Sequence, residues 1–274
     1  MIYLIILIPF LGSLIGALSV FFIKEVNSKL SKFMYGFSAG VMIAAAIFSL
    51  LVPAMDLSKF NSKYNNEFFL ILLTTLGLIC GFLFMIFLEK ISGKILDEKL
   101  KNSISTEKNN EKNRYKRLKS SILLFIAITV HNIPEGIVTG IGLVDTSNLF
   151  YAFSLALGIA IQNIPEGVIS SVPFREETGS NLNAFILGTL SGIIEPIFGI
   201  ITIKFVSCFI SITPFILTFA AGCMIFVVLK ELIPNCLGFE INNDDNECED
   251  ESNVGMISFL VGFIVMMILD VVLA

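Results

Sequence analysis

Residues 120–143 read SSILLFIAITVHNIPEGIVTGIGL, and residues 149–173 read LFYAFSLALGIAIQNIPEGVISSVP. Each stretch is an apolar run long enough to span a membrane, and each carries a similar polar string near its middle, HNIPEG at 131–136 and QNIPEG at 162–167. A carboxylate at the centre of a membrane costs about 3 kcal/mol or more unless it is paired, hydrated or bound to a cation. The repeated string therefore marks a candidate functional site inside a membrane.

The composition places the whole chain in a membrane. Hydrophobic residues make up 55% of its 274 residues, and charged residues make up 15%. A helix needs about 20 apolar residues to cross roughly 30 Å of hydrocarbon. We therefore predict an all-α integral membrane protein of one domain, an eight-transmembrane-helix bundle with helices at about 2–23, 33–55, 68–88, 120–143, 149–173, 182–203, 214–237 and 254–273. The first run has no charged n-region and no small-x-small cleavage site, so we expect a retained helix rather than a signal peptide.

The distribution of Lys and Arg predicts the orientation, because cytoplasmic loops retain these residues during insertion. Ten of them fall between Lys90 and Lys119. Both termini are then extracytoplasmic, and the chain is a multi-pass protein of the plasma (inner) membrane. Residues 92–119 are polar and poor in aromatics, which predicts a mobile cytoplasmic loop. The acidic segment 240–251 is interpreted as a second cytoplasmic loop, either simply solvated or weakly cation-capturing.

Glycines four residues apart indicate close helix packing, because they let membrane helices approach backbone to backbone. The chain has five such pairs: Gly12 and Gly16, Gly36 and Gly40, Gly77 and Gly81, Gly136 and Gly140, and Gly188 and Gly192. Together they predict a tight bundle.

The repeated string has a definite geometry on a helix, where residues four apart share a face. His131 lies one turn from Glu135, and Gln162 lies one turn from Glu166. At about 1.5 Å per residue, both pairs fall near the membrane midplane. Two neighbouring helices can therefore present these four side chains to one gap.

The strings hold further polar groups. Pro134 and Pro165 each remove a backbone hydrogen bond, and the freed carbonyl must find water, a neighbour or an ion. Asn132 and Asn163 lie about 100° around the helix from the preceding residue and can face a second, adjoining site. Glu195, near the middle of the sixth span, is another candidate.

Imidazole, carboxylate and amide oxygen form a ligand set of intermediate softness. Such sets suit Zn²⁺, Fe²⁺, Mn²⁺ or Co²⁺, whereas Ca²⁺ and Mg²⁺ favour sites made of oxygens alone. His131 is the chain's single histidine, and a lone membrane histidine is ordinarily a hydrogen-bonded packing residue. The glutamate one turn away, the repeat and the proline favour a metal ligand instead.

These motifs resemble those of the ZIP (Zrt/Irt-like) metal transporters, and within that family the bacterial GufA-like branch. The similarity covers eight spans with both termini outside, a long variable loop between the third and fourth spans, and the two Asn-x-Pro-Glu-Gly strings. Shorter similar segments are Ser49-Leu-Leu-Val-Pro-Ala54, Glu195-Pro196 and Glu231-Leu-Ile-Pro234 in the second, sixth and seventh spans.

The resemblance implies a fold in which helices 1–3 and 6–8 are inverted repeats around helices 4 and 5. It also implies two metal sites that share Glu166, one formed by His131, Glu135, Gln162 and Glu166 and the other by Asn132, Asn163, Glu166 and Glu195. Family members move metal toward the cytosol, and homodimers are common among them.

Two positions depart from the family pattern. Gln162 stands where many members have histidine, and its harder, neutral oxygen implies a weaker or less zinc-selective site. Lys230 replaces the histidine that often precedes Glu231 on the expected exit path, and a protonated lysine cannot bind metal. The favoured interpretation is that Lys230 reaches the interface or pairs with a neighbouring carboxylate. The alternative is a charge on the exit path that repels a departing cation or, in the empty state, replaces metal as the counter-charge to Glu231 or Glu135.

The sequence therefore predicts a transporter of divalent transition metals, zinc first and iron, manganese, cobalt or cadmium after it, and not an enzyme. No cofactor is required beyond the transported ion. The expected partners are the metal cation, the lipid bilayer and a second copy of the chain, and no nucleic acid. The alternatives are a membrane-embedded metalloenzyme with an activated water and a metal-binding protein that does not transport. A single histidine excludes the His-Glu-x-x-His motif, which argues against the enzyme.

Overall fold

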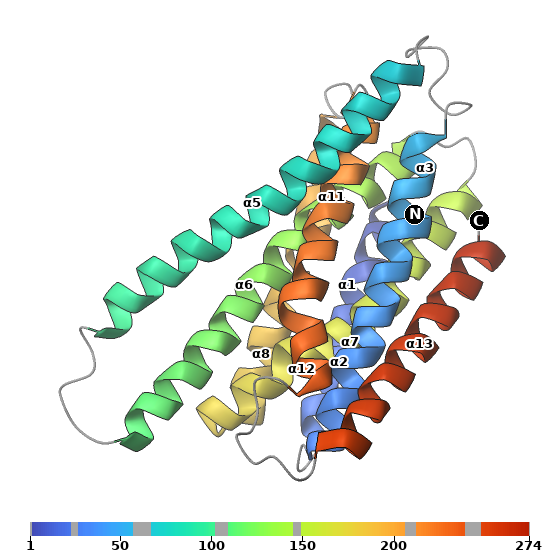
Figure 1. Cartoon of the computed structure of the whole chain (residues 1–274). Coiled ribbons are helices and arrows are strands. Elements are labelled where there is room, and N and C mark those ends of the chain that lie inside the picture. The colour runs from blue at the N-terminus through green and yellow to red at the C-terminus, as the bar shows by residue number, and fades with distance from the viewer. Residues whose placement is uncertain are drawn as a thin grey trace.

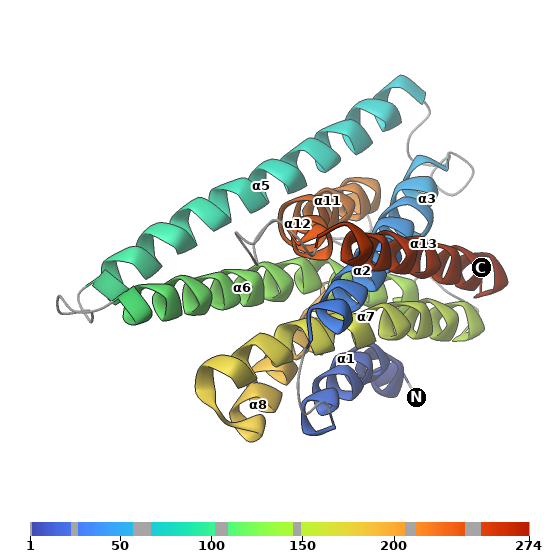
Figure 2. The same ribbon diagram turned by 60° about the horizontal axis from the view of Figure 1, so that its bottom comes forward.

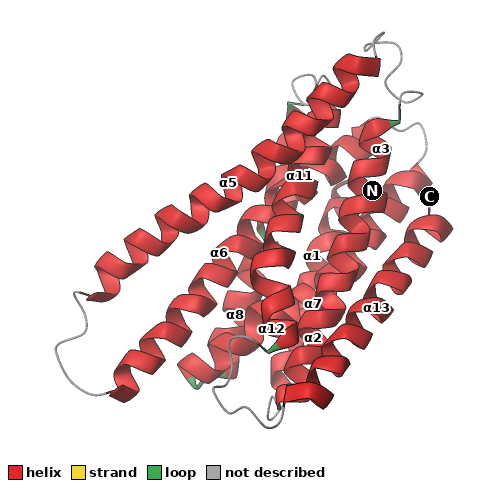
Figure 3. Ribbon diagram, in the orientation of Figure 1, coloured by secondary structure: helices red, strands yellow, loops and turns green. Residues whose placement is uncertain are grey.

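A computed structural model describes residues 2–22, 27–56, 67–101, 109–144, 149–205, 212–238 and 248–273. Over these ranges the regular elements are all helices (Figure 1; Figure 3). Within the same ranges, eight helical segments are long and apolar enough to cross a membrane. The predicted all-α bundle of eight transmembrane helices is confirmed.

Four spans are single helices: α5 (Glu67–Lys101), α6 (Asn109–Val144), α7 (Leu149–Thr178) and α13 (Cys248–Leu273). The other four change helix type or break. The first is α1 (Ile2–Leu18) with the 3-10 turn η1 (Ser19–Phe21), and the second is α2 (Ser28–Ala44), the π-helix η2 (Ala45–Leu51) and α3 (Val52–Met55). The sixth is α8 (Asn181–Gly192) and α9 (Ile194–Lys204), and the seventh is α11 (Thr213–Val227), the π-helix η4 (Val228–Leu232) and α12 (Ile233–Leu237).

Helices α5 and α6 are longer than predicted and replace most of the loop predicted over 92–119. Residues 92–101 complete α5 and residues 109–119 belong to α6, while residues 102–108 lie outside the described residues. Lys, Glu and Leu are good helix formers, and a helix already nucleated in the membrane extends at little cost because nucleation is the costly step. Of the predicted acidic loop, residues 248–251 begin α13, and the remainder lies outside the described residues.

The helices pack in pairs that repeat. Helix α2 packs along α13, α11 along α5 and α1 along α7 (Figure 2). Helix α9 packs along α6. Suppose that helices 1–3 are exchanged with helices 6–8, and α6 with α7. The α2–α13 pair then becomes the α11–α5 pair, and the α1–α7 pair becomes the α9–α6 pair. This is the packing expected of inverted repeats around helices 4 and 5.

The repeat is also visible in the sequence. Residues 81–89 of α5 read GFLFMIFLE, and residues 262–270 of α13 read GFIVMMILD. The two stretches share glycine, phenylalanine, methionine and leucine, and both end on an acidic residue. They belong to the third and eighth spans, which are equivalent helices in the inverted repeat.

Glycines bring the paired helices into backbone contact, as the sequence predicts. A Cβ on Gly40 would strike the Phe259 carbonyl, and a Cβ on Gly222 would strike the Leu78 carbonyl. The two contacts are equivalent, because Phe259 and Leu78 each lie three residues before the glycine of their matched stretch. The other predicted pairs also make close contacts: Gly12 and Gly16 with α7, Gly36 with α13, Gly77 and Gly81 with α11, Gly136 and Gly140 with α9, and Gly188 and Gly192 with Ser171 and Ser13.

Candidate metal centre

Helices α6 and α7 place the two repeated strings against each other inside the bundle. Both helices continue unbroken through the prolines of the strings. His131 is 0% exposed, and Glu135, Gln162 and Glu166 are at most 3% exposed. The four side chains predicted to share a gap are therefore all buried.

His131 is held in one orientation by two contacts. Its Nδ1 lies 3.2 Å from the carbonyl oxygen of Ala127, one turn earlier, and its Nε2 lies 3.1 Å from Oε2 of Glu166. A carbonyl oxygen only accepts, so Nδ1 carries a hydrogen and Nε2 faces the carboxylate. Metal-binding histidines commonly donate their second ring N–H to a carbonyl in this way, which aims the other nitrogen at the ion.

Gln162 connects the two glutamates of the strings. Its amide nitrogen donates to Oε1 of Glu135 and, over 3.5 Å, to Oε1 of Glu166. Rotation of the amide about its terminal bond exchanges nitrogen and oxygen and would point the oxygen in the same direction. Gln162 can therefore either bridge the carboxylates or supply an oxygen ligand.

His131, Glu135 and Glu166 lie close enough to share one cation. One ligand atom from each residue lies within 4.8 Å of the other two. A zinc ion bonded at about 2.0–2.2 Å to nitrogen and oxygen separates its ligands by roughly 3–4 Å. A small inward movement would close the three atoms around one ion, whose charge would offset the two buried carboxylates.

A second polar group is built around Asn163 and Glu195. Nδ2 of Asn163 donates to Oε2 of Glu195 over 2.8 Å and to the Pro9 carbonyl over 3.2 Å. On the other central helix, Nδ2 of Asn132 donates to the Ser191 carbonyl over 3.1 Å. Each asparagine thus fixes its nitrogen on a neighbouring helix and leaves its oxygen for another partner.

Glu195 lies where the sixth span breaks. Helix α8 ends at Gly192 and α9 begins at Ile194, so Glu195 stands in the first turn of α9. The helix dipole favours a carboxylate in a first turn, and Gly136 packs directly on the Glu195 backbone. Broken helices are a common means of presenting polar groups at the midplane of transporters.

Four acceptor oxygens in these groups are buried and have no hydrogen-bond partner among the described residues. They are Oε2 of Glu135, Oδ1 of Asn132, Oδ1 of Asn163 and Oε1 of Glu195. Each such atom costs about 1–3 kcal/mol, and more when it is charged, so native proteins keep few of them. Carboxylate and amide oxygens beside an imidazole fit a divalent transition metal. The division of these residues into two sites that share Glu166 stays a prediction.

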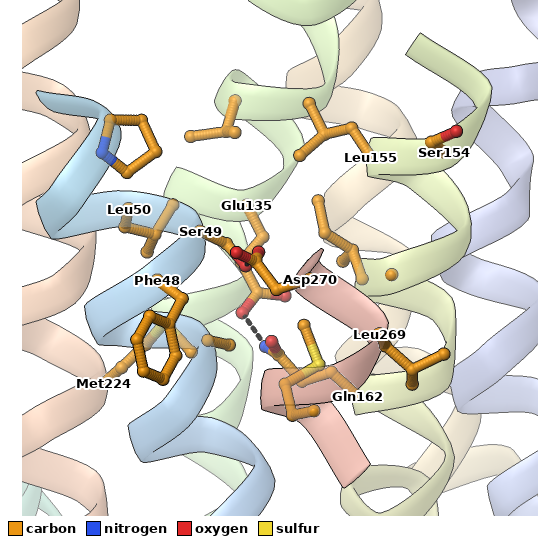
Figure 4. A pocket seen from close by; sticks show the side chains of 16 residues that line it. Phe48, Ser49, Leu50, Glu135, Ser154, Leu155, Gln162, Met224, Leu269 and Asp270 are labelled. Atoms are coloured by element: carbon orange, nitrogen blue, oxygen red, sulfur yellow. Dashed lines mark hydrogen bonds between the residues drawn. The ribbon is translucent and has the colours of Figure 1, made fainter. Parts of the chain in front are cut away.

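A cavity of about 140 Å³ reaches this centre between the second, fourth, fifth, seventh and eighth spans. Glu135 and Gln162 extend into it from α6 and α7 and are joined by their hydrogen bond (Figure 4). Ser49 and Asp270 also line it, and Oγ of Ser49 donates to Oδ1 of Asp270 over 2.6 Å. Asp270 is not among the predicted site residues, because its only signal in the sequence is a lone acidic residue near the end of an apolar run.

Lys230 and Glu231 lie together on η4. Nζ of Lys230 is 3.6 Å from Oε1 of Glu89 on α5, so the lysine has the carboxylate neighbour that the favoured interpretation predicts. Glu231 and Glu89 line a second cavity of about 10 Å³, which also touches Ala127 of α6. No sequence motif marks Glu89 as the partner of Lys230.

Known proteins match almost the whole chain. Residues 97–270 match the family described as ZIP Zinc transporter. The chain is 32% identical over 259 residues to the zinc transporter ZupT of Lysinibacillus sphaericus, an alignment that covers 93% of this chain and 90% of the relative. It is 29% identical over 321 residues to the zinc transporter ZIP11 of Xenopus tropicalis, covering 93% and 92%. With ZupT of Streptococcus mutans it shares 35% identity over 224 residues, covering 80% and 81%.

An eight-helix membrane bundle that buries imidazole and carboxylate groups at its centre defines a class of metal-handling membrane proteins. The chain belongs to the ZIP zinc transporter family. The resemblance found in the sequence is confirmed, and the bacterial ZupT relatives agree with the bacterial branch.

Proposed function

We propose that the chain carries divalent transition-metal ions into the cytosol through its buried centre, zinc before iron, manganese, cobalt or cadmium. The observation that carries this proposal is the cluster of His131, Glu135 and Glu166, whose ligand atoms lie within 4.8 Å of one another inside the bundle. The relatives are named zinc transporters, which makes zinc the first ion to test.

Two adjoining sites would account for the buried polar groups. The first uses His131, Glu135, Gln162 and Glu166, and the second uses Asn132, Asn163, Glu166 and Glu195. The oxygens without hydrogen-bond partners supply ligands to both. Glu166 is shared, so that one ion at either site is always adjacent to its carboxylate.

The path begins in the cavity lined by Asp270 and Ser49, where Glu135 and Gln162 meet the incoming ion. Their oxygens replace the water that the ion loses. Both termini face outside the plasma (inner) membrane, because Lys and Arg gather in the segment between the third and fourth spans. The ion leaves past η4, where Lys230 and Glu231 lie. A homodimer stays a prediction.

Transport is favoured over a membrane-embedded metalloenzyme and over a metal-binding protein that does not transport. The relatives that match about nine-tenths of the chain are named transporters. No cofactor is assigned, because the bound metal is the cargo.

Uptake of radioactive zinc, iron and manganese into proteoliposomes tests the proposal. Wild type is compared with Glu166→Ala and with the matched control Glu67→Ala, which removes an exposed carboxylate at the start of α5. We expect uptake by wild type and control, and none above empty vesicles for Glu166→Ala. Metal binding by wild type without uptake would identify a storage or sensing protein instead.

A further inference from the structure

The inverted repeat relates the two cavities to each other. Ser49 of η2 bonds to Asp270 of α13 in the larger cavity, and these two residues form the outer mouth. Lys230 of η4 pairs with Glu89 of α5 at the smaller one. Ser49 and Lys230 each stand four residues before the proline of their span, and Asp270 and Glu89 are the acidic residues that end the matched stretches. The two pairs occupy equivalent places in the two halves of the protein.

The two mouths carry different charges. The residue after Ser49 is Leu50, whereas the residue after Lys230 is Glu231. Glu231 lines the smaller cavity together with Glu89, and these two residues with Lys230 form the inner mouth. Of the residues that form the two mouths, the outer one therefore has the carboxylate of Asp270, with Glu135 lining the same cavity. The inner one has the carboxylates of Glu89 and Glu231 and adds the ammonium of Lys230.

Two carboxylates beside a narrow cavity are a ligand set that divalent cations prefer. This cavity touches Ala127, whose carbonyl holds the His131 ring, so an ion released from His131 toward the cytosol would meet both carboxylates. Without a counter-charge they would retain it. An ammonium on a flexible stem cannot bind metal, but it competes with metal for a carboxylate.

The geometry of the Lys230–Glu89 pair suits an ion pair that metal can displace better than a permanent one. Lys230 is 53% exposed and Glu89 is 34% exposed, with 3.6 Å between Nζ and Oε1. Exposed ion pairs are weak, because water and salt screen them and long side chains lose entropy on pairing. The ammonium can therefore leave Glu89 when metal arrives and return when metal departs.

We propose that Lys230 is a tethered counter-ion that speeds release of the transported metal from the inner mouth. It pairs with Glu89 as the ion leaves, so that the two carboxylates do not hold the ion. The proposal rests on the proposed transport function and on the termini facing outside. It concerns how long the inner mouth holds the ion, and the overall direction of transport is still set by the gradients.

Right-side-out and everted membrane vesicles from the same cells present zinc to each mouth separately. The readout is the ratio of the half-saturating zinc concentration at the cytoplasmic face to that at the external face. Lys230→Ser installs the residue of the equivalent outer position. We expect the ratio to fall by about two- to fivefold, the range that an exposed ion pair is worth. Influx should also become more sensitive to zinc already inside.

Two further variants sharpen the test. Lys230→Ser combined with Glu231→Leu makes the inner mouth a copy of the outer one and should raise the ratio again toward that of wild type. Lys94→Ser removes an exposed lysine that lies five residues after Glu89 on α5, and it should leave the ratio unchanged. Lys230→Gln replaces Lys230→Ser if the serine variant does not reach the membrane.

The outcomes separate this inference from the proposed function. If the wild type transports zinc but the Lys230 variants leave the ratio unchanged, the counter-ion role alone would be overturned. An equal fall in Lys94→Ser would do the same, because any lost positive charge would then suffice. No zinc flux through wild type would overturn the transport function and this inference together.

Discussion

Nε2 of His131 lies 3.1 Å from Oε2 of Glu166, across the contact between α6 and α7. The contact joins the two copies of the repeated string, and both side chains are buried. A buried pair of this kind stabilises a fold weakly, because desolvation offsets much of the attraction. Its value is positional: it holds an imidazole nitrogen and a carboxylate oxygen at a distance that one metal ion can bridge.

Replacing Glu166 should abolish transport of every metal, because its carboxylate belongs to both proposed sites. Glu166→Ala should therefore show no uptake above empty vesicles. Removing one member of a buried charged pair also destabilises a fold by about 3–5 kcal/mol, so uptake is compared at equal amounts of folded protein. Glu195→Ala should be milder, because Glu195 belongs to one site only. Initial rates in proteoliposomes at equal protein content measure both. Near-normal flux through Glu166→Ala would show that the two-site assignment is wrong.

Gln162 should set the metal preference. Imidazole is a softer ligand than an amide oxygen and a better one for zinc. Gln162→His should therefore raise the preference for zinc over manganese by about tenfold, equal to roughly 1.4 kcal/mol of binding free energy. Competition of unlabelled metals against labelled zinc gives the ranking. An unchanged ranking would mean that residue 162 does not touch the transported ion.

Features confined to a short stretch of chain could be predicted from sequence. Apolar runs gave the eight spans, the repeated strings gave the buried polar group, and the glycine pairs gave the backbone contacts between helices. Contacts between distant segments could not be predicted. The pairing of Ser49 with Asp270 and of Lys230 with Glu89 depends on how the halves of the repeat pack, which no local pattern encodes.

The two π-helical segments could be predicted from the sequence only in part. η2 and η4 each end just before a proline-containing turn, formed by Pro53 in one span and by Pro234 in the other. A proline has no N–H for the carbonyl four residues earlier, and these carbonyls belong to Ser49 and Lys230. π-bulges relieve such a mismatch and often occur at functional sites. The prolines were visible in sequence, but the shifted hydrogen bonding became apparent only in the fold.

Asp270 should help to concentrate cations at the outer mouth. Its carboxylate lines the cavity that reaches Glu135 and Gln162, and a unit charge a few ångströms from an ion is worth about 1 kcal/mol in water. Asp270→Asn should raise the half-saturating external zinc concentration by about fivefold, while the maximal rate changes less. Glu67→Ala, which removes an exposed carboxylate at the start of α5, is the matched control. A lower maximal rate at unchanged half-saturation would place Asp270 outside the path.

The inverted repeat predicts that equivalent glycines have equivalent effects on stability. A Cβ on Gly40 or on Gly222 would strike the carbonyl of the paired helix, so Gly40→Ala and Gly222→Ala should each destabilise the protein by about 1–3 kcal/mol. Gly93→Ala is the control, since nothing lies within 4 Å of the added Cβ, and alanine should favour the helix by up to about 1 kcal/mol. Thermal unfolding of the purified proteins in detergent ranks the three variants. If Gly222→Ala unfolded no earlier than Gly93→Ala, the close contact between α11 and α5 would be disproved.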